Sequence, residues 1–410
     1  MHILVLADAF TPEVVAVSIR TLAHGKFWIS QGHEVTVVTS APNYPRGKVF
    51  EGYKNKLYQE EFIEGIRVIR VGTYMTANEG VIKRTLDYFS FTLSTVLQCW
   101  RLPKCDVIIA TSPTIFSAMA GSIISWLKRT PWVFEVRDLW PASIIAVGVS
   151  QSPLLKLVEK YELFMYRHAT RVIVLTHSFK RDLVSRGINP DKIVVVTNGI
   201  EVNKFKRPDS VVEAREELKV GVDDFLVGYV GTTGMAHGLE TVLEAADLCR
   251  DDKSIRFLIM GEGAKRADLE VQAADMKLDN LMFKDFVPHD QVIKYLSAMN
   301  MSIVHLRPDP LFETVIPSKI FEAMALGLPT IHAVEGESAE IVAKAGSGVC
   351  VPSGDPQAIA EQVRRFRKDP DALSKMAAAG QHVARTEYDR AALAGEISEV
   401  LETIVSIPEA

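Results

Sequence analysis

Cysteine is scarce in this chain. Its 410 residues include four, at positions 99, 105, 249 and 350, and no two of them form a C-x-x-C pair. This spacing argues against a disulfide framework and against a zinc site, so we expect reduced thiols, as in a cytoplasmic protein. Histidine, cysteine and aspartate form no cluster with metal-ligand spacing either, and we expect neither a metal nor another cofactor.

The sequence also has few features of an exported or membrane-spanning protein. No basic region precedes the apolar run that begins at Met1, so we expect no signal peptide. Residues 107–127 carry no charged side chain, and this length approaches that of a transmembrane helix. The Thr-Ser-Pro-Thr sequence at 111–114 interrupts the run, however, and predicts a strand (107–110) followed by a helix (115–127) instead of a membrane span.

Acidic residues are under-represented in the first half of the chain. Basic residues outnumber acidic ones in residues 1–207, acidic residues prevail in 208–410, and the net charge is −5. A basic first half favours an anionic partner on that side only. Nucleic acid is one candidate, but no recognised reading motif is present. Peripheral association with an anionic membrane, the inner face of the plasma membrane for a cytoplasmic protein, fits better.

One predicted helix, at 82–102, suits such a surface. Its apolar residues recur at helical spacing, and basic side chains flank them at Lys83, Arg84 and Arg101. This pattern is typical of an amphipathic helix in the membrane interface, and equally of a core helix with basic ends. The recurring residues are Ile82, Leu86, Phe89, Leu93, Val96 and Trp100.

Length and periodicity predict two α/β domains. A chain of 410 residues is too long for one compact core, and short apolar runs alternate with helical segments, as in parallel sheets. We expect a first doubly wound, Rossmann-like domain at 1–205, a second at 206–388, and a closing helix at 389–410. The strands are expected at 3–7, 35–39, 66–71, 107–110, 132–136, 171–175 and 193–196, and at 225–230, 255–260, 281–283, 301–304 and 329–333.

Two charged residues follow a predicted strand in the first domain. Arg137 and Asp138 come directly after the strand 132–136, and open α/β sheets bind ligands at the carboxyl ends of their strands. Asp138 is therefore a candidate catalytic residue. As an alternative, Asp138 is the N-cap of a helix at 139–146.

The stretch 308–330 predicts an anion site. Prolines at 308, 310 and 317 keep its first part out of helix, and a helix then opens at Ser318 or Lys319 and ends at Gly327. Backbone N–H groups at a helix start are unpaired, and the helix dipole is positive there, so a phosphate suits that end. Glu322, one turn deeper, suits hydroxyl groups. The alternative is an ordinary buried helix.

Several motifs, in order, carry a family resemblance. They are Gly32-His33-Glu34-Val35-Thr36-Val37-Val38-Thr39, Thr197-Asn198-Gly199-Ile200 with Phe205, Gly261-Glu262-Gly263, Pro317-Ser318-Lys319 and the run from Phe321 to Pro329. Together they resemble a retaining glycosyltransferase of family 4, with the GT-B fold, over essentially the whole chain. Asn43-Tyr44-Pro45, Asp138-Leu139-Trp140-Pro141 and Pro317-Ser318-Lys319 further resemble the bacterial branch that builds surface polysaccharides such as O-antigen and capsule, one type of which transfers N-acetyl-fucosamine-like sugars.

The resemblance implies an architecture and a reaction. The two domains of a GT-B enzyme face a cleft, and the closing helix returns to the first domain. A hexose or N-acetylhexosamine passes, with retention, from a nucleoside-diphosphate sugar, expected to be UDP-linked, to a glycan or a polyprenyl-diphosphate-linked acceptor. A GT-B epimerase acting on UDP-N-acetylglucosamine and a non-catalytic GT-B partner subunit remain alternatives.

The resemblance also implies roles for single residues. Glu322 takes the ribose hydroxyls, the loop Val287-Pro288 lies against the base, and Gly231, Thr232 and His237 face the diphosphate. Asp138 acts as a base or orients the acceptor, beside Arg137. Glu262, Thr314 and Ser318 complete the expected donor site, together with Lys319.

The sequence departs from the family pattern in the donor site. The usual Glu-x₇-Glu has Thr314 in its first place, with Glu313 one position off register. The usual arginine and lysine of the Gly-rich segment are replaced by Thr232 and His237, so we assign the permanent charge to Lys319, with Arg307 as second candidate. In the first domain, Arg137-Asp138 stands for the usual His-Asp, and Val15-Ala16-Val17 replaces the usual glycines.

Overall fold

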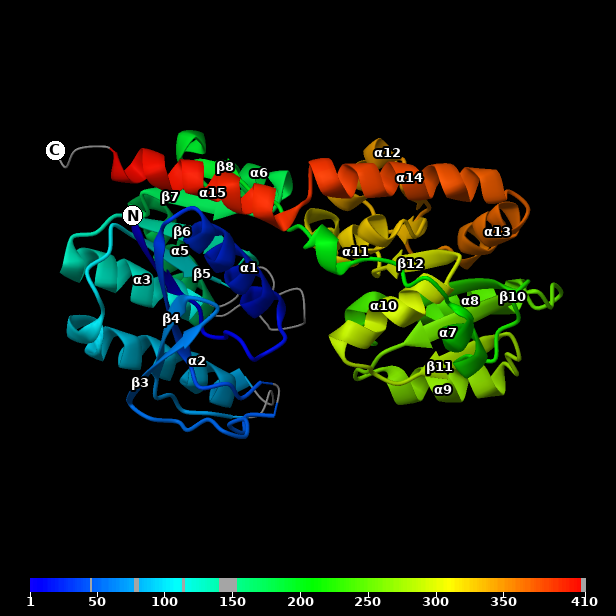
Figure 1. The fold of residues 1–410 in the computed structure, drawn as a ribbon, viewed down its shortest axis with the longest axis horizontal. Coiled ribbons are helices and arrows are strands. Elements are labelled where there is room, and N and C mark those ends of the chain that lie inside the picture. The colour runs from blue at the N-terminus through cyan, green and yellow to red at the C-terminus, as the bar shows by residue number, and fades with distance from the viewer. Residues whose placement is uncertain (45, 77–80, 113–114, 140–152, 407–410) are drawn as a thin grey trace. The chain divides into compact units, whose positions relative to one another are not determined.

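The computed structural model describes residues 1–44, 46–76, 81–112, 115–139 and 153–406. The chain forms two compact α/β units, Met1–Thr197 with Arg390–Ala410, and Asn198–Asp389 (Figure 1). The division therefore falls before residue 205, because Ile200, Val202 and Phe205 pack into the core of the second unit. Ile200 also forms an isolated bridge with Asp389 within that unit.

The first unit is built on an eight-stranded sheet. Its strands lie in the order β3-β4-β2-β1-β5-β6-β7-β8, and every pair except the antiparallel β3–β4 is parallel. The strands are β1 (His2–Leu6), β2 (Glu34–Ser40), β3 (Tyr58–Ile63), β4 (Ile66–Val71), β5 (Val107–Thr111), β6 (Trp132–Val136), β7 (Arg171–Val174) and β8 (Ile193–Val195). Its helices are α1 (Ala16–Ser30), α2 (Val81–Leu97), η1 (Cys99–Arg101), α3 (Ile115–Lys128), α5 (Pro153–His168), α6 (His177–Ser185), η2 (Pro190–Lys192) and α15 (Arg390–Val405).

The last helix returns to the first unit, as the GT-B resemblance implies. Helix α15 packs against α1, and the indole Nε1 of Trp28 donates to the carbonyl oxygen of Ala394 at 3.1 Å. Leu393, Ile397 and Leu401 of α15 share a core with the apolar strands β1 and β2. Burial of this apolar stripe, rather than helix propensity, holds the chain end in place.

The second unit holds a six-stranded parallel sheet. The strand order is β11-β10-β9-β12-β13-β14. The strands are β9 (Phe225–Val230), β10 (Ile255–Met260), β11 (Leu281–Lys284), β12 (Met301–His305), β13 (Thr330–Ala333) and β14 (Gly348–Cys350). Its helices are η3 (Val202–Lys204), α7 (Val212–Glu217), η4 (Met235–His237), α8 (Glu240–Leu248), α9 (Arg266–Asp275), α10 (His289–Ala298), η5 (Phe312–Thr314), α11 (Lys319–Leu326), α12 (Glu337–Ala345), α13 (Pro356–Arg367) and α14 (Pro370–Thr386).

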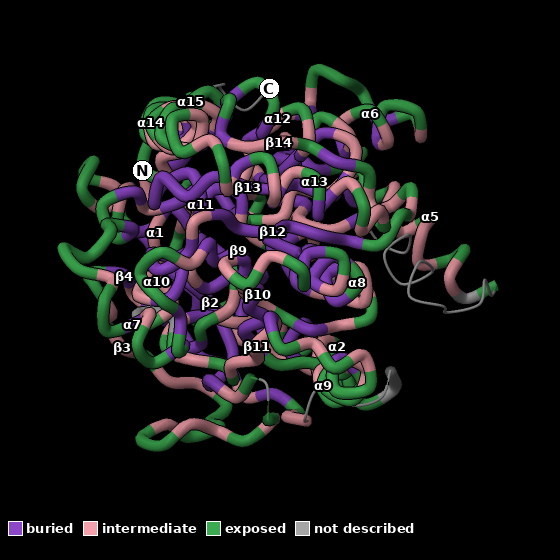
Figure 2. Tube along the Cα trace, turned by 90° about the vertical axis from the view of Figure 1, so that its right-hand side faces the viewer, coloured by how far each residue is buried: buried purple, intermediate pink, exposed green. Residues whose placement is uncertain are grey.

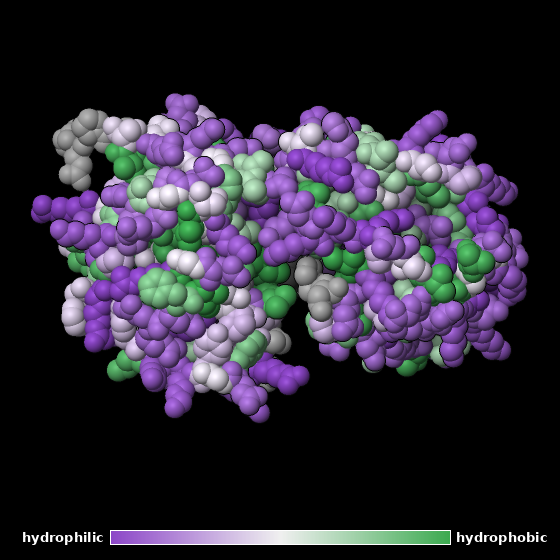
Figure 3. Space-filling model, in the orientation of Figure 1, coloured by the Kyte–Doolittle hydropathy of each residue, from purple (hydrophilic) through white to green (hydrophobic). Residues whose placement is uncertain are grey.

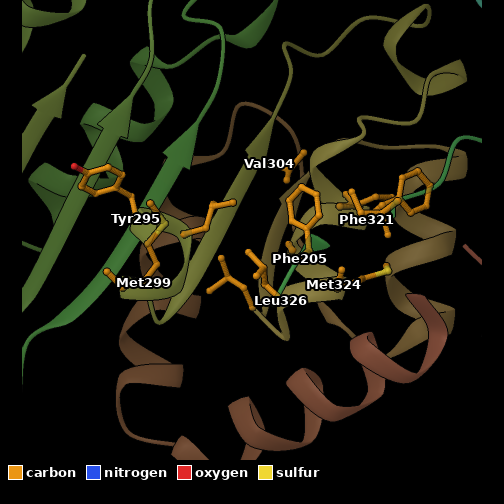
Figure 4. Close-up of a cluster of buried hydrophobic side chains, with 14 of the residues drawn as sticks. Phe205, Tyr295, Met299, Val304, Phe321, Met324 and Leu326 are labelled. Carbon is orange, nitrogen blue, oxygen red and sulfur yellow. The ribbon is translucent and has the colours of Figure 1, made fainter. Parts of the chain in front are cut away.

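Helix α11 is held in place by its buried apolar side chains. Ile320, Phe321 and Met324 are buried, and Figure 4 shows Phe321 and Met324 in one cluster with Phe205 and Val304. The strands β12 and β13 beside this helix are buried throughout, as Figure 2 shows in purple. Gly327 ends α11 at φ 61°, a left-handed conformation that favours glycine. The core thus fixes where the first turn of α11 can lie.

Two strands were not predicted from the sequence. Strand β3, an antiparallel edge strand, carries Glu60, Glu61 and an exposed Phe62, so its pattern lacks the apolar run of a parallel strand. Strand β14 has only three residues. The expected helix at 139–146 lies outside the described residues from Trp140 onward. Among the residues that the structure describes, no helix is both long and apolar enough to cross a bilayer.

Candidate functional sites in the two units

Lys319 stands at the start of α11. The cap residue Ser318 makes no side-chain cap hydrogen bond, so the first amides of this helix have no cap from that side chain. The ammonium of Lys319 donates to the hydroxyl of Tyr229 at 2.6 Å and lies 3.8 Å from the ring centroid. Burial lowers the pKa of Lys319 to about 7, although Glu322 acts in the opposite direction. A partly desolvated amine at a helix start favours an anionic ligand.

Gly231 makes room for this lysine. It follows β9 with φ 138°, and a Cβ built there would lie 2.5 Å from both Cε and Nζ of Lys319. Gly261, after β10, likewise has no room for a side chain, because its Cβ would lie 2.1 Å from the carbonyl oxygen of Gly231. The amide of Thr233 donates to the carbonyl oxygen of Glu262 at 2.9 Å. The two Gly-rich loops are therefore packed backbone against backbone beside Lys319.

His237 lines the same cavity as the lysine. Its carbonyl oxygen accepts from Nδ1 of His305 at 2.6 Å, and Nε2 of His305 accepts from the amide of Gly354 at 3.1 Å. These two bonds assign the proton of His305 to Nδ1. Burial, together with the charge of Lys319, lowers the pKa of His237 to about 4. His237 is therefore neutral at pH 7, and its buried Nδ1 has no hydrogen-bond partner among the described residues.

A cavity of about 280 Å³ adjoins these residues. It brings together His237, Ser318 and Lys319 of the predicted donor site. The rest of the wall consists of Val304, His305, Leu306, Val315, Ile316 and Pro317. This cavity therefore combines an amine, a neutral imidazole and a helix start, a set that suits a phosphate group.

The other predicted donor residues lie outside this wall. Glu322 is half-buried one turn into α11, and Thr232 and Glu262 are exposed on the Gly-rich loops. Val287 packs partly against the core, whereas Pro288 is exposed at the start of α10.

Neither Thr314 nor Glu313 directs its side chain to the role of the first glutamate in the Glu-x₇-Glu pattern. The hydroxyl of Thr314 donates to the carbonyl oxygen of Leu311 at 2.7 Å, within its own loop. The side chain of Glu313 is exposed, and its backbone oxygen is so close to Gly336 that a Cβ there would lie 2.1 Å away. Arg307, the second candidate for the permanent charge, is paired with Glu240 at 3.4 Å and is 45% exposed.

The first unit has its own cavity, of about 310 Å³. Arg137 and Asp138 line it at the carboxyl end of β6, where the sequence predicts a ligand site. The amide of Arg137 donates to the hydroxyl of Ser112, after β5, at 2.7 Å. The wall comprises Asp8, Ala9, Glu13, Val15, Ala16, Val17, Ser40, Asn43, Tyr44, Thr76, Arg84, Asp87, Tyr88, Phe91, Arg137 and Asp138.

The charge states of Arg137 and Asp138 depend on each other. Burial raises the pKa of Asp138 to about 6, against the opposing charge of Arg137. Burial also lowers the pKa of Arg137 to about 10, and its Nη1 has no hydrogen-bond partner among the described residues. A carboxylate that exchanges a proton near pH 6 is suited to act as a general base.

Sequence reasoning missed several residues of these two sites. Tyr229 and His305 lie in buried strands or at their ends, where a polar side chain resembles a core residue. Asp8 and Glu13 lie in the loop between β1 and α1, and Asp87 lies on α2. Only Asp8, directly after the first predicted strand, had a positional signal. Within the described parts of the chain, no group of three or more His, Cys, Asp or Glu side chains could hold a metal ion.

Comparison with known families agrees with this division of the chain. Residues 15–199 match the model of the glycosyl transferase 4-like domain, and residues 211–383 match that of glycosyl transferases group 1. The two matched segments lie in the first and second unit, respectively, apart from Asn198 and Gly199.

Curated relatives match over most of their length. The chain is 27% identical over 379 residues, 89% of this chain and 92% of the other, to WcaI of Escherichia coli, named as a glycosyl transferase of colanic acid biosynthesis. It is 23% identical over 340 residues, 80% of this chain and 85% of the other, to the capsular polysaccharide biosynthesis glycosyltransferase CapM of Staphylococcus aureus.

Solved structures share the fold. Anabaena HepE, in a complex with UDP, matches with a TM-score of 0.73 at 17% identity over 98% of this chain and 100% of the other. Sucrose-phosphate synthase from Thermosynechococcus elongatus matches with a TM-score of 0.75 at 18% identity over 98% of each chain. At these identities the likeness concerns the fold.

Proposed function

The chain belongs to the group 1 glycosyltransferases, and we propose that it transfers a sugar, with retention, from a UDP-linked donor to a lipid-linked or oligosaccharide acceptor in the biosynthesis of a bacterial surface polysaccharide. A hexose or an N-acetylhexosamine, including the N-acetyl-fucosamine type, is the proposed sugar. Relatives named for colanic acid, capsule and amylovoran biosynthesis support the polysaccharide. Structures of HepE in complex with UDP support the nucleotide.

The single observation that carries the donor assignment is the environment of Lys319. Its amine lies at a helix start that has no side-chain cap from Ser318, contacts Tyr229, and lines one cavity together with His237. The donor diphosphate brings negative charge to this place, and more charge develops on it as the sugar leaves. Lys319 therefore binds the diphosphate and stabilises the leaving group, with Ser318 as a further donor.

The remaining donor contacts follow from the loops around that site. Glu322, deeper in α11, accepts from the ribose hydroxyls. The loop at Val287 and Pro288 lies against the base. Gly231 and Thr232 present backbone to the diphosphate, and Glu262 and Thr314 border the donor sugar.

Chemistry on the acceptor side is assigned to Asp138. In a front-face displacement the leaving phosphate can take the acceptor proton, so no covalent nucleophile is required. Asp138 then holds the acceptor hydroxyl or takes its proton, and Arg137 keeps this carboxylate ionised near neutral pH. No metal or other cofactor is assigned to this reaction.

A polyprenyl-diphosphate acceptor is anchored in a membrane, so the reaction is proposed to take place at the inner face of the plasma membrane. Helix α2 is the proposed membrane contact. Leu86, Phe89, Leu93 and Leu97 form one exposed stripe, continued by Trp100, which is 77% exposed. Apolar residues stand among hydrophilic ones on the surface of the first unit (Figure 3). A stripe of this kind with Lys83, Arg84 and Arg101 beside it suits an anionic membrane surface.

The proposed function is tested by product analysis. Purified protein is incubated with a panel of UDP-sugars and a polyprenyl-diphosphate-linked acceptor, with and without chelator. The expected result is UDP release matched by a glycolipid whose new linkage keeps the anomeric configuration of the donor, at the same rate in chelator. Epimerised UDP-sugar without transfer indicates the epimerase alternative, and absence of any turnover across a full nucleotide-sugar panel indicates a non-catalytic subunit.

A further inference from the structure

Carboxylates outnumber basic side chains in the wall of the first unit's cavity. Six of its lining residues carry charge, and four of these are carboxylates: Asp8, Glu13, Asp87 and Asp138, against Arg84 and Arg137. Asp8 and Glu13 both lie in the loop between β1 and α1, and Asp87 lies on α2. The apolar side chains Val15, Val17 and Phe91 complete the wall.

One carboxylate oxygen in this wall is buried without a partner. Glu13 is only 3% exposed. Its Oε1 accepts from the amides of Asn43 and Tyr44, both at 2.8 Å. Its Oε2 has no hydrogen-bond partner among the described residues. Leaving a buried acceptor unpaired costs free energy, so a ligand that donates a hydrogen bond here would stabilise the site.

The charge of Glu13 acts on both Asp8 and Asp87. Burial, and then the charge of Glu13, raises the pKa of Asp8 to about 6. Burial, and then the charge of Asp8, raises the pKa of Asp87 to about 7, and Glu13 adds to this shift. The pKa of Asp138, by contrast, is shifted by burial and by Arg137 alone. The three carboxylates thus form one cluster, in which each further negative charge is unfavourable. Arg137 and Arg84 oppose the shifts of Asp8 and Asp87, respectively, but burial and the neighbouring carboxylates outweigh them.

We propose that Glu13, Asp8 and Asp87 bind the acceptor's sugar through its hydrogen-bond donors, and that this group rejects acceptor sugars that carry a carboxylate. This inference rests on the proposed function. A hydroxyl donates to Oε2 of Glu13, neighbouring hydroxyls donate to Asp8 and Asp87, and the C–H face of the ring lies on the apolar wall. A uronate would add a negative charge beside these carboxylates, where each further charge is unfavourable.

Glu13→Gln is the most selective test. The Oε1 atom of glutamine can still accept from Asn43 and Tyr44, so the loop anchor is kept, while an N–H replaces the free acceptor. Asp87→Asn removes one of the three charges from α2. Glu51→Gln, an exposed carboxylate outside the cavity, is the matched control. Thermal midpoints of all variants show whether the fold is kept.

Binding is measured by saturation-transfer NMR with methyl glycosides in the gluco and galacto series, each as neutral sugar, uronate and amine. We expect the amine to bind at least as well as the neutral sugar, and the uronate about tenfold more weakly or worse. Glu13→Gln should bind the neutral sugar more weakly by a similar factor. Asp87→Asn should reduce the difference in affinity between the neutral sugar and the uronate, and Glu51→Gln should bind both as wild type does.

Each contrary result overturns the inference. These are equal binding of uronate and neutral sugar, weaker binding of the amine, unchanged binding in a folded Glu13→Gln variant, or no glycoside binding at all. UDP binding is measured in the same samples, so that failure of this inference can be told apart from failure of the proposed function. Normal UDP binding with no sugar discrimination contradicts only this inference, whereas sugar discrimination without UDP binding contradicts the proposed donor.

Discussion

At the scale of single residues, the environment of Lys319 is formed by residues that the sequence around position 319 does not indicate. The helix start at 318–319 and its affinity for an anion could be predicted, because proline, serine and lysine precede an apolar run. The contact with Tyr229 could not, since a tyrosine inside a buried strand has the same pattern as any core residue. Gly231 was expected to face a phosphate, and the structure adds that its missing side chain admits the lysine.

Lys319→Ala should lower the turnover number more than it weakens UDP binding. The amine meets charge that grows on the diphosphate in the transition state, so its loss acts mainly on the chemical step. We expect a decrease of about 10²–10³-fold in turnover, as for the removal of one donor from an oxyanion site. Steady-state kinetics with a saturating donor measures it.

Arg307→Ala is the matched control, because Arg307 is a half-exposed cation whose side chain pairs with Glu240. This variant should keep most of the turnover. Wild-type turnover in Lys319→Ala, combined with an inactive Arg307→Ala, would assign the charge to the arginine instead.

UDP affinity should fall as the pH rises above 7. In the free protein the pKa of Lys319 is lowered to about 7 by burial, and a bound diphosphate favours the ammonium and raises this pKa. Above pH 7 binding therefore takes up a proton, whereas well below pH 7 the amine is already charged and adds no pH dependence. Calorimetry at pH 8 in buffers of different ionisation enthalpy measures the uptake, which Lys319→Ala should abolish. A wild-type protein that takes up no proton is incompatible with this account.

At the scale of elements, α1 is tied to the sheet by a buried charge. Arg20, 2% exposed, donates from Nε to Oε1 of Glu135 on β6 at 2.9 Å. It also donates from Nη1 to the carbonyl oxygen of Thr197 at 2.9 Å. An arginine in a helical segment predicts a solvent-exposed position, so the buried pair of Arg20 and Glu135 could not be predicted from the sequence. Burial alone raises the pKa of Glu135, yet Arg20 and Arg137 hold it below its usual value.

Arg20→Met should destabilise the protein by roughly 3–5 kcal/mol, because it leaves Glu135 as an unpaired buried charge. Chemical denaturation followed by the fluorescence of Trp28 and Trp132 measures the loss. Adding Glu135→Leu to the same variant should recover most of the stability, since the orphaned charge is then removed. A single variant as stable as wild type, or a double variant no better than the single, would show that the pair is not the cause.

For helix α2, periodicity alone could not distinguish an amphipathic helix in the membrane interface from a core helix. Leu86, Phe89, Leu93 and Trp100 of its predicted apolar stripe are exposed, and Val96 is half-buried. The buried residues Phe91, Thr92 and Thr95 lie on another face, and α2 packs against α3. The alternative of a core helix, in which Leu86, Phe89 and Leu93 are buried, is therefore wrong. Helical spacing fixes which residues share a face, but neighbouring elements decide which face is covered.

The double variant Leu93→Ser/Leu97→Ser should weaken binding to vesicles of anionic lipid, because it removes apolar area from the exposed stripe. Basic residues nearby add about 1 kcal/mol each near a charged surface, so wild-type binding should fade with salt. Vesicle flotation measures both effects. Val271→Ser, a similarly exposed apolar residue of the second unit, is the control. Equal binding of wild type to neutral and anionic vesicles would disprove the membrane proposal.

At the scale of the whole molecule, the alternation of strands and helices predicted two Rossmann-like units. The parallel strands were predictable because their apolar runs are buried on both faces. The boundary near 205 was placed too late, since Ile200 and Phe205 are core residues of the second unit. Asp8 and Glu13 share one loop, but no pattern in the sequence could bring Asp87 of α2 into the same cavity, because that proximity is created by the order of the strands.

The central claim is that the second unit binds a nucleoside diphosphate through its phosphates at the start of α11. The most direct measurement is calorimetric titration of the protein with UDP and with uridine at pH 7. The account predicts that UDP binds about a hundredfold more tightly or better, a difference of roughly 2.7 kcal/mol, and that Lys319→Ala narrows this gap while leaving the uridine affinity unchanged. Equal affinity of the wild-type protein for UDP and uridine, or a gap that persists undiminished in Lys319→Ala, would contradict it.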